Sequence, residues 1–202
     1  MNRREFLKSV GVVSAAVSLI LSNSPSQAAD PQPVTVLVTY HSATGNTEKM
    51  AQGVAEGAKA VSGTLVVLKR VGDVTENDLV SADAVIVGSP VYFGNMSGEV
   101  KTFFDNWSKF GLFRDRKMRN KVGGAFATGA SVSSGKEVTM LTIFAAMFIN
   151  QMIVVSGGGG FGASASTGTD SPGIDEKELA EARDLGKRVA EVAGLVKRGS
   201  GK

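Results

Sequence analysis

Apolar positions along the chain alternate between two patterns, short uninterrupted runs and stripes spaced three or four residues apart. Uncharged runs rich in β-branched residues are typical of buried strands. They occupy residues 34–40, 65–68, 84–87, 122–127 and 152–155. Stripes typical of amphipathic helices lie at residues 47–61, 75–79, 100–107, 138–149 and 175–196. This alternation predicts an α/β protein with a doubly wound, five-stranded parallel sheet and helices on both faces.

Local signals also mark two helix starts and one loop. Thr75 with Asp78, and Asp175 with Glu178, have the three-residue spacing of a capping pair. Residues 157–172 begin with four glycines and continue with small residues. Because long loops inside compact domains are usually functional or mobile, we expect a loop of that kind there.

The first residues have the layout of a targeting segment. Arg3 and Arg4 open it, an apolar run covers residues 10–21, and the small residues Ala28 and Ala29 close it. The run is shorter than the roughly 20 residues that a membrane-spanning helix needs. A charged start, a short apolar middle and a small-residue end predict a secretory signal, cleaved near Ala28 or Ala29.

The adjacent arginines are followed by Glu-Phe-Leu-Lys, and this start resembles a twin-arginine export signal. We therefore expect residues 1–29 to engage the twin-arginine translocase and residues 30–202 to form a single periplasmic domain. An ordinary secretory signal or an uncleaved anchor is the alternative interpretation.

Composition removes several classes of function. The 202 residues include no cysteine and one histidine, His41, so no disulfide, thiolate metal site or multi-histidine metal site is expected. The net charge of +3 falls to +1 when Arg3, Arg4, Lys8 and Glu5 of the targeting segment are set aside. A nearly neutral domain makes nucleic acid an unfavourable partner.

One turn between the first strand and the first helix has the residue types of a phosphate loop. The candidates are Ser42, Thr44, Gly45, Asn46 and Thr47. A helix start offers free backbone N–H groups and a positive dipole end, hydroxyls add donors, and glycine permits close approach. No P-loop lysine and no G-x-G-x-x-G follow this strand, which favours a monophosphate such as that of FMN over a triphosphate or dinucleotide. A helix cap without a ligand is the alternative, and His41 beside it is interpreted as a bystander more than as a proton-dependent donor.

This turn resembles the FMN phosphate loop of flavodoxins. A second stretch, Gly88-Ser89-Pro90-Val91-Tyr92-Phe93-Gly94-Asn95-Met96-Ser97-Gly98, is similar to the flavin loop of WrbA-type NAD(P)H:quinone oxidoreductases. The resemblance covers about residues 34–196. It implies a flavodoxin-like sheet of order 2-1-3-4-5, FMN as cofactor, NAD(P)H as electron donor and a quinone as acceptor.

The same resemblance implies roles for particular residues. Residues 42–47 would hold the ribityl phosphate, and the loop after the third strand would line the flavin ring with Pro90, Val91, Tyr92, Phe93 and Asn95. Asn150 aligns near the family's flavin-side histidine, and Phe113 near an aromatic residue that flanks the substrate pocket.

A third wall is expected after the fourth strand, because ligands of such sheets lie beyond the carboxyl ends of the strands. Its candidates are Thr128, Gly129, Ala130 and Ser131. The flavin N5 would carry the hydride, so no catalytic side chain is expected. The family's long insertion after the second strand is replaced by Gly72-Asp73-Val74, which leaves a homo-oligomer open.

The preferred function is therefore an FMN-dependent, two-electron oxidoreductase acting on quinones or similar acceptors. A one-electron carrier is the first alternative, although such carriers are usually acidic to steer basic partners. A flavin-binding protein without turnover is the second. Because NAD(P)H is scarce outside the cytoplasm, a membrane quinol or partner protein remains an alternative donor for an exported enzyme.

A basic segment precedes the fourth strand and contains Arg114, Arg116, Lys117, Arg119 and Lys121. It has the charge to attract phosphates of a pyridine nucleotide or a membrane surface. A solvated loop is the alternative.

Overall fold

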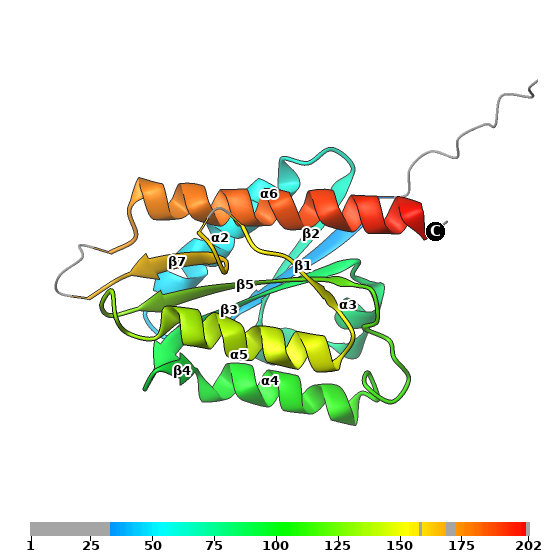
Figure 1. Cartoon of the computed structure of the whole chain (residues 1–202), viewed down its shortest axis with the longest axis horizontal. Coiled ribbons are helices and arrows are strands. Elements are labelled where there is room, and N and C mark those ends of the chain that lie inside the picture. Colours follow the sequence, from blue (N-terminus) through cyan, green and yellow to red (C-terminus); the bar gives the residue numbers. More distant parts are fainter. Residues whose placement is uncertain (1–32, 158, 169–172, 201–202) are drawn as a thin grey trace, which may run out of the picture. The chain divides into compact units, whose positions relative to one another are not determined.

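The computed structural model describes residues 33–157, 159–168 and 173–200 (Figure 1). The targeting segment expected at residues 1–29 lies outside these residues. Within them, no helix is both long enough and apolar enough to span a membrane.

A parallel sheet forms the centre of the fold. Its order is β2 (Thr64–Arg70), β1 (Val34–Tyr40), β3 (Ala84–Tyr92) and β5 (Val122–Gly129), followed by β6 (Ile153–Val154). This arrangement confirms the order 2-1-3-4-5 expected from the sequence. The strands end together, so that the last residues of β1, β3 and β5 lie at one edge, called here the carboxyl edge; their first residues lie at the amino edge.

The sheet has seven strands where five were predicted. β4 (Asn95–Met96) adds a short antiparallel pair to β3. The fifth position is shared by two pieces, because β6 pairs with the start of β5 and β7 (Ala163–Ser166) pairs with its end. The prediction of a long loop was therefore wrong at β7. Its buried residues are alanines, which carry too little hydrophobic signal to mark a strand.

Helices cover both faces of the sheet, as predicted (Figure 1). α2 (Asn46–Lys59) and α6 (Glu176–Gly199) pack on one face around Val36, Ile86 and Phe126. The other face is covered by the short 3₁₀ turn η1 (Val71–Asp73) and by α3 (Glu76–Ser81), α4 (Gly98–Lys109) and α5 (Lys136–Ile149). Each strand of the centre therefore has both faces buried, which explains its uncharged sequence.

Two glycines let α2 and α6 approach at the level of their backbones. A Cβ atom on Gly57 would collide with the carbonyl oxygen of Arg183, and one on Gly186 would collide with that of Val54. Side chains larger than hydrogen at these two positions would push the helices apart. This packing holds α2, whose first turn contributes to the carboxyl edge.

Both predicted capping pairs are confirmed. Thr75 and Asp78 exchange side-chain to backbone hydrogen bonds at the start of α3, and Asp175 and Glu178 do so at the start of α6. Asp78 also accepts two hydrogen bonds of 2.8 Å from Lys69 Nζ. Burial alone would raise the pKa of Asp78, but the bonds from Lys69 and Thr75 outweigh it and lower the pKa to about 2.

We expect Asp78→Asn to lower the free energy of unfolding at pH 7 by about 2 kcal/mol, the value of a shift of nearly two pKa units. Because the folded pKa is depressed, this stability is fully present above the unfolded pKa near 3.8 and is lost as pH falls toward 2. Urea unfolding at several pH values measures it. The exposed Asp105→Asn, which breaks a pair with Lys101, should cost less than about 1 kcal/mol. A variant difference that does not shrink between pH 4 and pH 2 would contradict the prediction.

Candidate functional site

The first turn of α2 forms an open cradle at the carboxyl edge. Gly45 occupies the N-cap position of the helix with φ of 89° and has no side chain that could accept a hydrogen bond from the first turn. The Gly45 N–H donates to Ser42 Oγ at 3.1 Å, which holds the preceding turn. A Cβ on Gly45 would meet no atom within 4 Å. The helix start therefore presents backbone donors and its positive dipole end to open space, as an anion site requires.

Further polar contacts join this turn to its neighbours. Thr47 Oγ1 lies 2.8 Å from Thr128 Oγ1, and both threonines are buried. Asn46 Nδ2 donates to Thr44 Oγ1 at 3.2 Å. The structure thus brings the predicted first and third loops together at one edge.

Arg70, at the end of β2, contacts the predicted phosphate loop. Its Nη1 donates to the Ser42 carbonyl oxygen at 2.9 Å, while its Nη2 pairs with Glu48. Arg70 could not be singled out from the sequence, because a basic residue at the end of a strand carries no local signal of this contact.

The second loop exposes two aromatic rings at the same edge. Tyr92 ends β3 and is 42% exposed, and Phe93 follows it, fully exposed, with φ of 50°. Pro90 and Val91, which precede them, are half-buried. A positive φ costs free energy in a residue other than glycine, and full exposure of an aromatic ring to water costs more. Such rings fit a flat aromatic ligand that would cover them.

Asn95 has a positioning role in this loop. Its Oδ1 accepts from Thr142 Oγ1 at 2.8 Å and from the Met96 N–H at 2.7 Å. A Cβ on Gly135 would lie 2.9 Å from Gly94 Cα, so the second loop packs closely against the start of α5. The side chain of Asn95 therefore fixes the second loop to α5.

The third loop contains polar groups that sequence analysis missed. Thr128 and Gly129 end β5, and Ala130 and Ser131 continue the loop, exposed to solvent. Lys136, buried at the start of α5, donates to the Ser131 carbonyl oxygen at 3.3 Å and to Ser166 Oγ.

Ser134 lies against Gly129, where a Cβ would collide with its Oγ, and this buried Oγ has no hydrogen-bond partner among the described residues. An unpaired buried hydroxyl is unfavourable unless a ligand or water satisfies it. A helix start after a glycine, at Gly135, was the available signal for Ser134 and Lys136.

Two residues predicted for the site, Asn150 and Phe113, lie at the far ends of α5 and α4 from the start of each helix. Asn150 follows the last residue of α5, whose 14 residues place it about 20 Å from the third loop. Its Nδ2 donates to the Ala146 carbonyl oxygen, as in a helix cap. Phe113 lies beyond the far end of α4, whose 12 residues span about 18 Å. Both assignments came from the resemblance to the family and stay predictions. Asn150 lines a cavity of about 590 Å³ that also includes Asn95 and Met96 of the second loop.

A cavity of about 760 Å³ adjoins the aromatic loop. His41 lines it and packs edge-on against Tyr92, with ring centroids 6.3 Å apart. Glu99 lies on its rim, 3.6 Å from His41 Nε2. A hydrogen bond from its own backbone N–H, supported by Ser97 and His41, lowers the pKa of Glu99. The cavity is large enough for a small aromatic substrate.

The residues of the carboxyl edge fit FMN. The start of α2 supplies backbone N–H groups that can bind a phosphate without a lysine. The exposed rings suit a flat ring system, and the buried Ser134 Oγ has a hydrogen-bonding capacity that a ligand can satisfy. Among the described residues no group of three histidine, aspartate or glutamate side chains is arranged to hold a metal ion. A doubly wound sheet with three such loops defines the class of flavodoxin-like proteins.

Comparisons with known proteins narrow this class. Residues 73–165 match the NADPH-dependent FMN reductase family. The NAD(P)H dehydrogenase (quinone) of Chromohalobacter salexigens is 33% identical over an alignment of 195 positions, which covers 78% of this chain and 96% of that protein. The protein of the same name from Archaeoglobus fulgidus is 34% identical over 191 residues, with the same coverage. The chain belongs to the NAD(P)H dehydrogenase (quinone) family.

Solved structures of similar proteins have the same fold. A flavodoxin, WrbA-like protein from Agrobacterium tumefaciens superposes with a TM-score of 0.69 at 31% identity, covering 80% of this chain and 98% of that one. An archaeal flavodoxin superposes with a TM-score of 0.64 at 24% identity, covering 79% and 99%, which supports the fold alone.

We expect Lys136→Met to make the midpoint potential of bound FMN more negative, because a buried positive charge near the site favours the reduced, more negative flavin. Every 1.4 kcal/mol of lost preference corresponds to about 30 mV for a two-electron couple. Spectroelectrochemical titration measures it. The exposed Lys101→Met, which loses a pair with Asp105, is the control. An unchanged potential at full flavin content would show that Lys136 only braces the loop.

Proposed function

We propose that the protein is an FMN-dependent oxidoreductase that passes two electrons from NAD(P)H to a quinone or similar acceptor. The observation that carries the proposal is the start of α2, which has no side-chain cap at Gly45 and lies beside the Thr47–Thr128 contact, where the first and third loops meet next to the end of β3. The matching family and the quinone dehydrogenases that resemble the chain support the same reaction. FMN, when bound, would supply the hydride chemistry.

The chain's own residues bind FMN and orient its ring. Backbone N–H groups after Gly45 hold the phosphate, and the hydroxyl of Ser42 fixes the turn that presents them. Tyr92 and Phe93 offer apolar surface to the ring. The cavity beside His41 gives a flat acceptor access to the ring from the α4 side.

An absorbance spectrum of the purified protein, followed by anaerobic addition of NADH or NADPH, tests the reaction. Flavin bands that bleach fully and return with a benzoquinone are the expected result. Bands that persist with pyridine nucleotide, and that dithionite reduces in two separate one-electron steps, would favour an electron carrier. Absence of flavin after incubation with FMN would overturn both.

We further propose that the protein reaches the periplasm through the twin-arginine translocase. The support is the sequence of residues 1–29, with Arg3 and Arg4 before the apolar run. Fractionation of cells that express the full chain tests it. Arg3→Lys combined with Arg4→Lys should keep the protein in the cytoplasm, and equal export of the variant would contradict the proposal.

We also propose that the protein forms a homo-oligomer through α5. This helix leaves an apolar stripe exposed to solvent, which consists of Val138, Leu141, Phe148 and Ile149. A helix that is apolar on its outer side as well as its inner side is typical of a buried element. Sedimentation equilibrium tests the proposal, with Leu141→Glu combined with Phe148→Glu expected to dissociate the assembly and a monomeric wild type contradicting it.

A further inference from the structure

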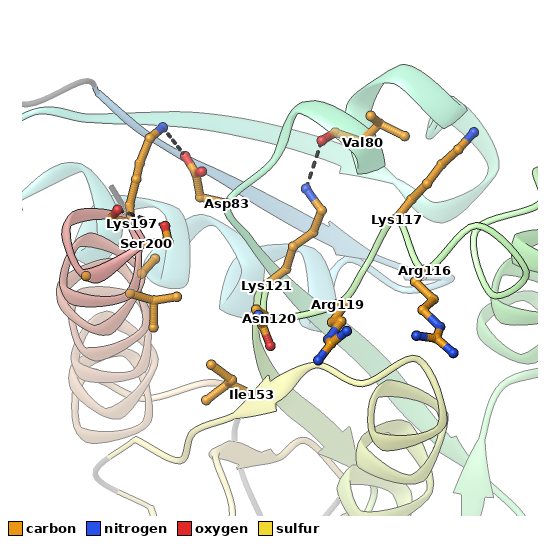
Figure 2. Close-up of a pocket in the computed structure, with 13 residues that line it drawn as sticks. Val80, Asp83, Arg116, Lys117, Arg119, Asn120, Lys121, Ile153, Lys197 and Ser200 are labelled. Atoms are coloured by element: carbon orange, nitrogen blue, oxygen red, sulfur yellow. Dashed lines mark hydrogen bonds and ion pairs between the residues drawn. The ribbon is translucent and has the colours of Figure 1, made fainter. Parts of the chain in front are cut away.

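A second large cavity lies at the amino edge of the sheet, on the side opposite the flavin loops (Figure 2). Its volume is about 790 Å³. The end of α3, the segment before β5, the start of β6 and the end of α6 contribute its walls. None of its lining residues belongs to the candidate flavin site.

The cavity carries an excess of positive charge. Its lining includes five basic residues, Arg116, Lys117, Arg119, Lys121 and Lys197, and one acidic residue, Asp83. The carboxylate of Asp83 is engaged, since Oδ2 accepts from Lys197 Nζ at 2.8 Å and from the Thr35 N–H at 2.9 Å. The acid therefore offsets Lys197 and leaves the other side of the cavity basic.

The remaining lysines have partners of their own. Lys117 Nζ lies 2.8 Å from Glu76 Oε1, which holds it against α3. Lys121 Nζ donates to the carbonyl oxygens of Val80 and Ala82. Both lysines thus fasten the basic segment to the rest of the fold.

Arg116 and Arg119 differ from these lysines. Over residues 33–157, 159–168 and 173–200, neither guanidinium has an ion pair or a side-chain hydrogen bond, and both side chains are exposed. The backbone between them is fixed, because the Arg119 N–H donates to the Arg116 carbonyl oxygen at 3.1 Å and Met118 is buried. Figure 2 shows both guanidinium groups on the same side of the segment, toward the strand that carries Ile153. Two unpaired arginines are therefore presented together on a rigid turn.

We propose that this cavity binds a phosphate-bearing ligand through Arg116 and Arg119. A guanidinium group offers a planar fork of donors that matches phosphate oxygens, and two such groups on one turn can hold one phosphate together. Ile153 and Val196 add apolar surface for the organic part of a phosphate ester.

A nicotinamide ring bound in this cavity would lie too far from the flavin of the same chain to donate a hydride. The seven residues of β1 separate the amino edge from the phosphate loop by about 20 Å. Hydride transfer requires reacting atoms roughly 3 to 3.5 Å apart. A ligand in this cavity is therefore held for regulation or for location.

Two sources would supply such a phosphate, a soluble phosphate ester or the head group of an anionic lipid. Two exposed apolar residues that line the cavity, Val80 and Ile153, are compatible with the second source. The chemistry of recognition at the two arginines is the same in both cases.

Calorimetric titration of the FMN-loaded full chain with inorganic phosphate and with pyrophosphate tests the proposal, alongside cosedimentation with vesicles of phosphatidylglycerol and phosphatidylcholine. The test variant combines Arg116→Gln with Arg119→Gln. The control combines Lys59→Gln with Lys177→Gln, which removes the same charge from exposed positions on α2 and α6. Flavin content and thermal stability confirm that each variant is folded.

We expect the arginine variant to weaken binding by about tenfold or more, the loss of charge-assisted hydrogen bonds, and the lysine control to change it less than about twofold. Binding of the soluble anions identifies a phosphate ester site, and arginine-dependent binding of the mixed vesicles alone identifies a lipid head group. Absence of both, or an equal loss in the lysine control, would overturn the proposal.

Discussion

Replacing Gly45 with aspartate should reduce FMN affinity by at least about 100-fold while leaving the apoprotein folded. The new carboxylate would lie at the helix start, where the phosphate is expected. Two unit charges 4 Å apart repel by about 4 kcal/mol at an effective dielectric constant near 20. Aspartate tolerates the left-handed backbone of this position better than most residues, and it has open space around it. Quenching of FMN fluorescence on titration measures the affinity.

Gly45→Asn is the matched control, because asparagine has nearly the same shape and no charge. It should lose affinity only through its bulk, by roughly tenfold or less, and both variants should lose about the same stability at φ of 89°. If the aspartate and asparagine variants bind FMN equally, the phosphate does not lie at the start of α2.

Replacing Gly57 with alanine should lower the free energy of unfolding by about 3 kcal/mol, although alanine is the better helix former by about 1 kcal/mol. The added methyl group would collide with the Arg183 carbonyl oxygen, which belongs to the backbone of α6 and cannot rotate away. For a domain of this size the midpoint of thermal unfolding should fall by roughly 10 °C. Calorimetry and urea unfolding measure the two quantities.

Gly53→Ala is the internal comparison on the same helix. A Cβ there would lie 3.2 Å from Ala182 Cβ and 3.5 Å from the nearest Leu179 atoms, which small shifts can accommodate. We expect this variant to be neutral or slightly more stable than the wild type. Equal destabilisation by both substitutions would mean that helix propensity or another general effect is involved instead of the backbone contact.

Sequence patterns predicted the strands and helices wherever burial leaves an apolar run or an apolar stripe in the sequence. The runs at β1, β3 and β5 are buried on both faces, so their lack of charge was sufficient. β7 was missed because alanine and serine pack against β5 through backbone hydrogen bonds without a hydrophobic signature. The capping pairs were recognisable because their hydrogen bonds are local in sequence.

The residues of the candidate site also fall into those that local sequence indicates and those that depend on tertiary contacts. The phosphate loop stays a prediction, and it could be made from the sequence because its residue types occupy consecutive positions between a strand and a helix. Lys136 and Arg70 were not, since their contacts depend on distant loops meeting at one edge. The roles of Asn150 and Phe113 came from the resemblance to the family, and they stay predictions, because each residue follows a helix and its distance from the site is not given by an alignment.

The divided fifth strand has a consequence for solubility. A long, regular strand at the border of a sheet offers a row of unpaired N–H and C=O groups to other molecules and invites aggregation. Here that border consists of two pieces, β6 with two residues and β7 with four, separated by residues 155–162. Neither piece is long enough to act as a template for a strand from another copy of the chain. We therefore expect this side of the sheet to resist edge-to-edge association even at high protein concentration.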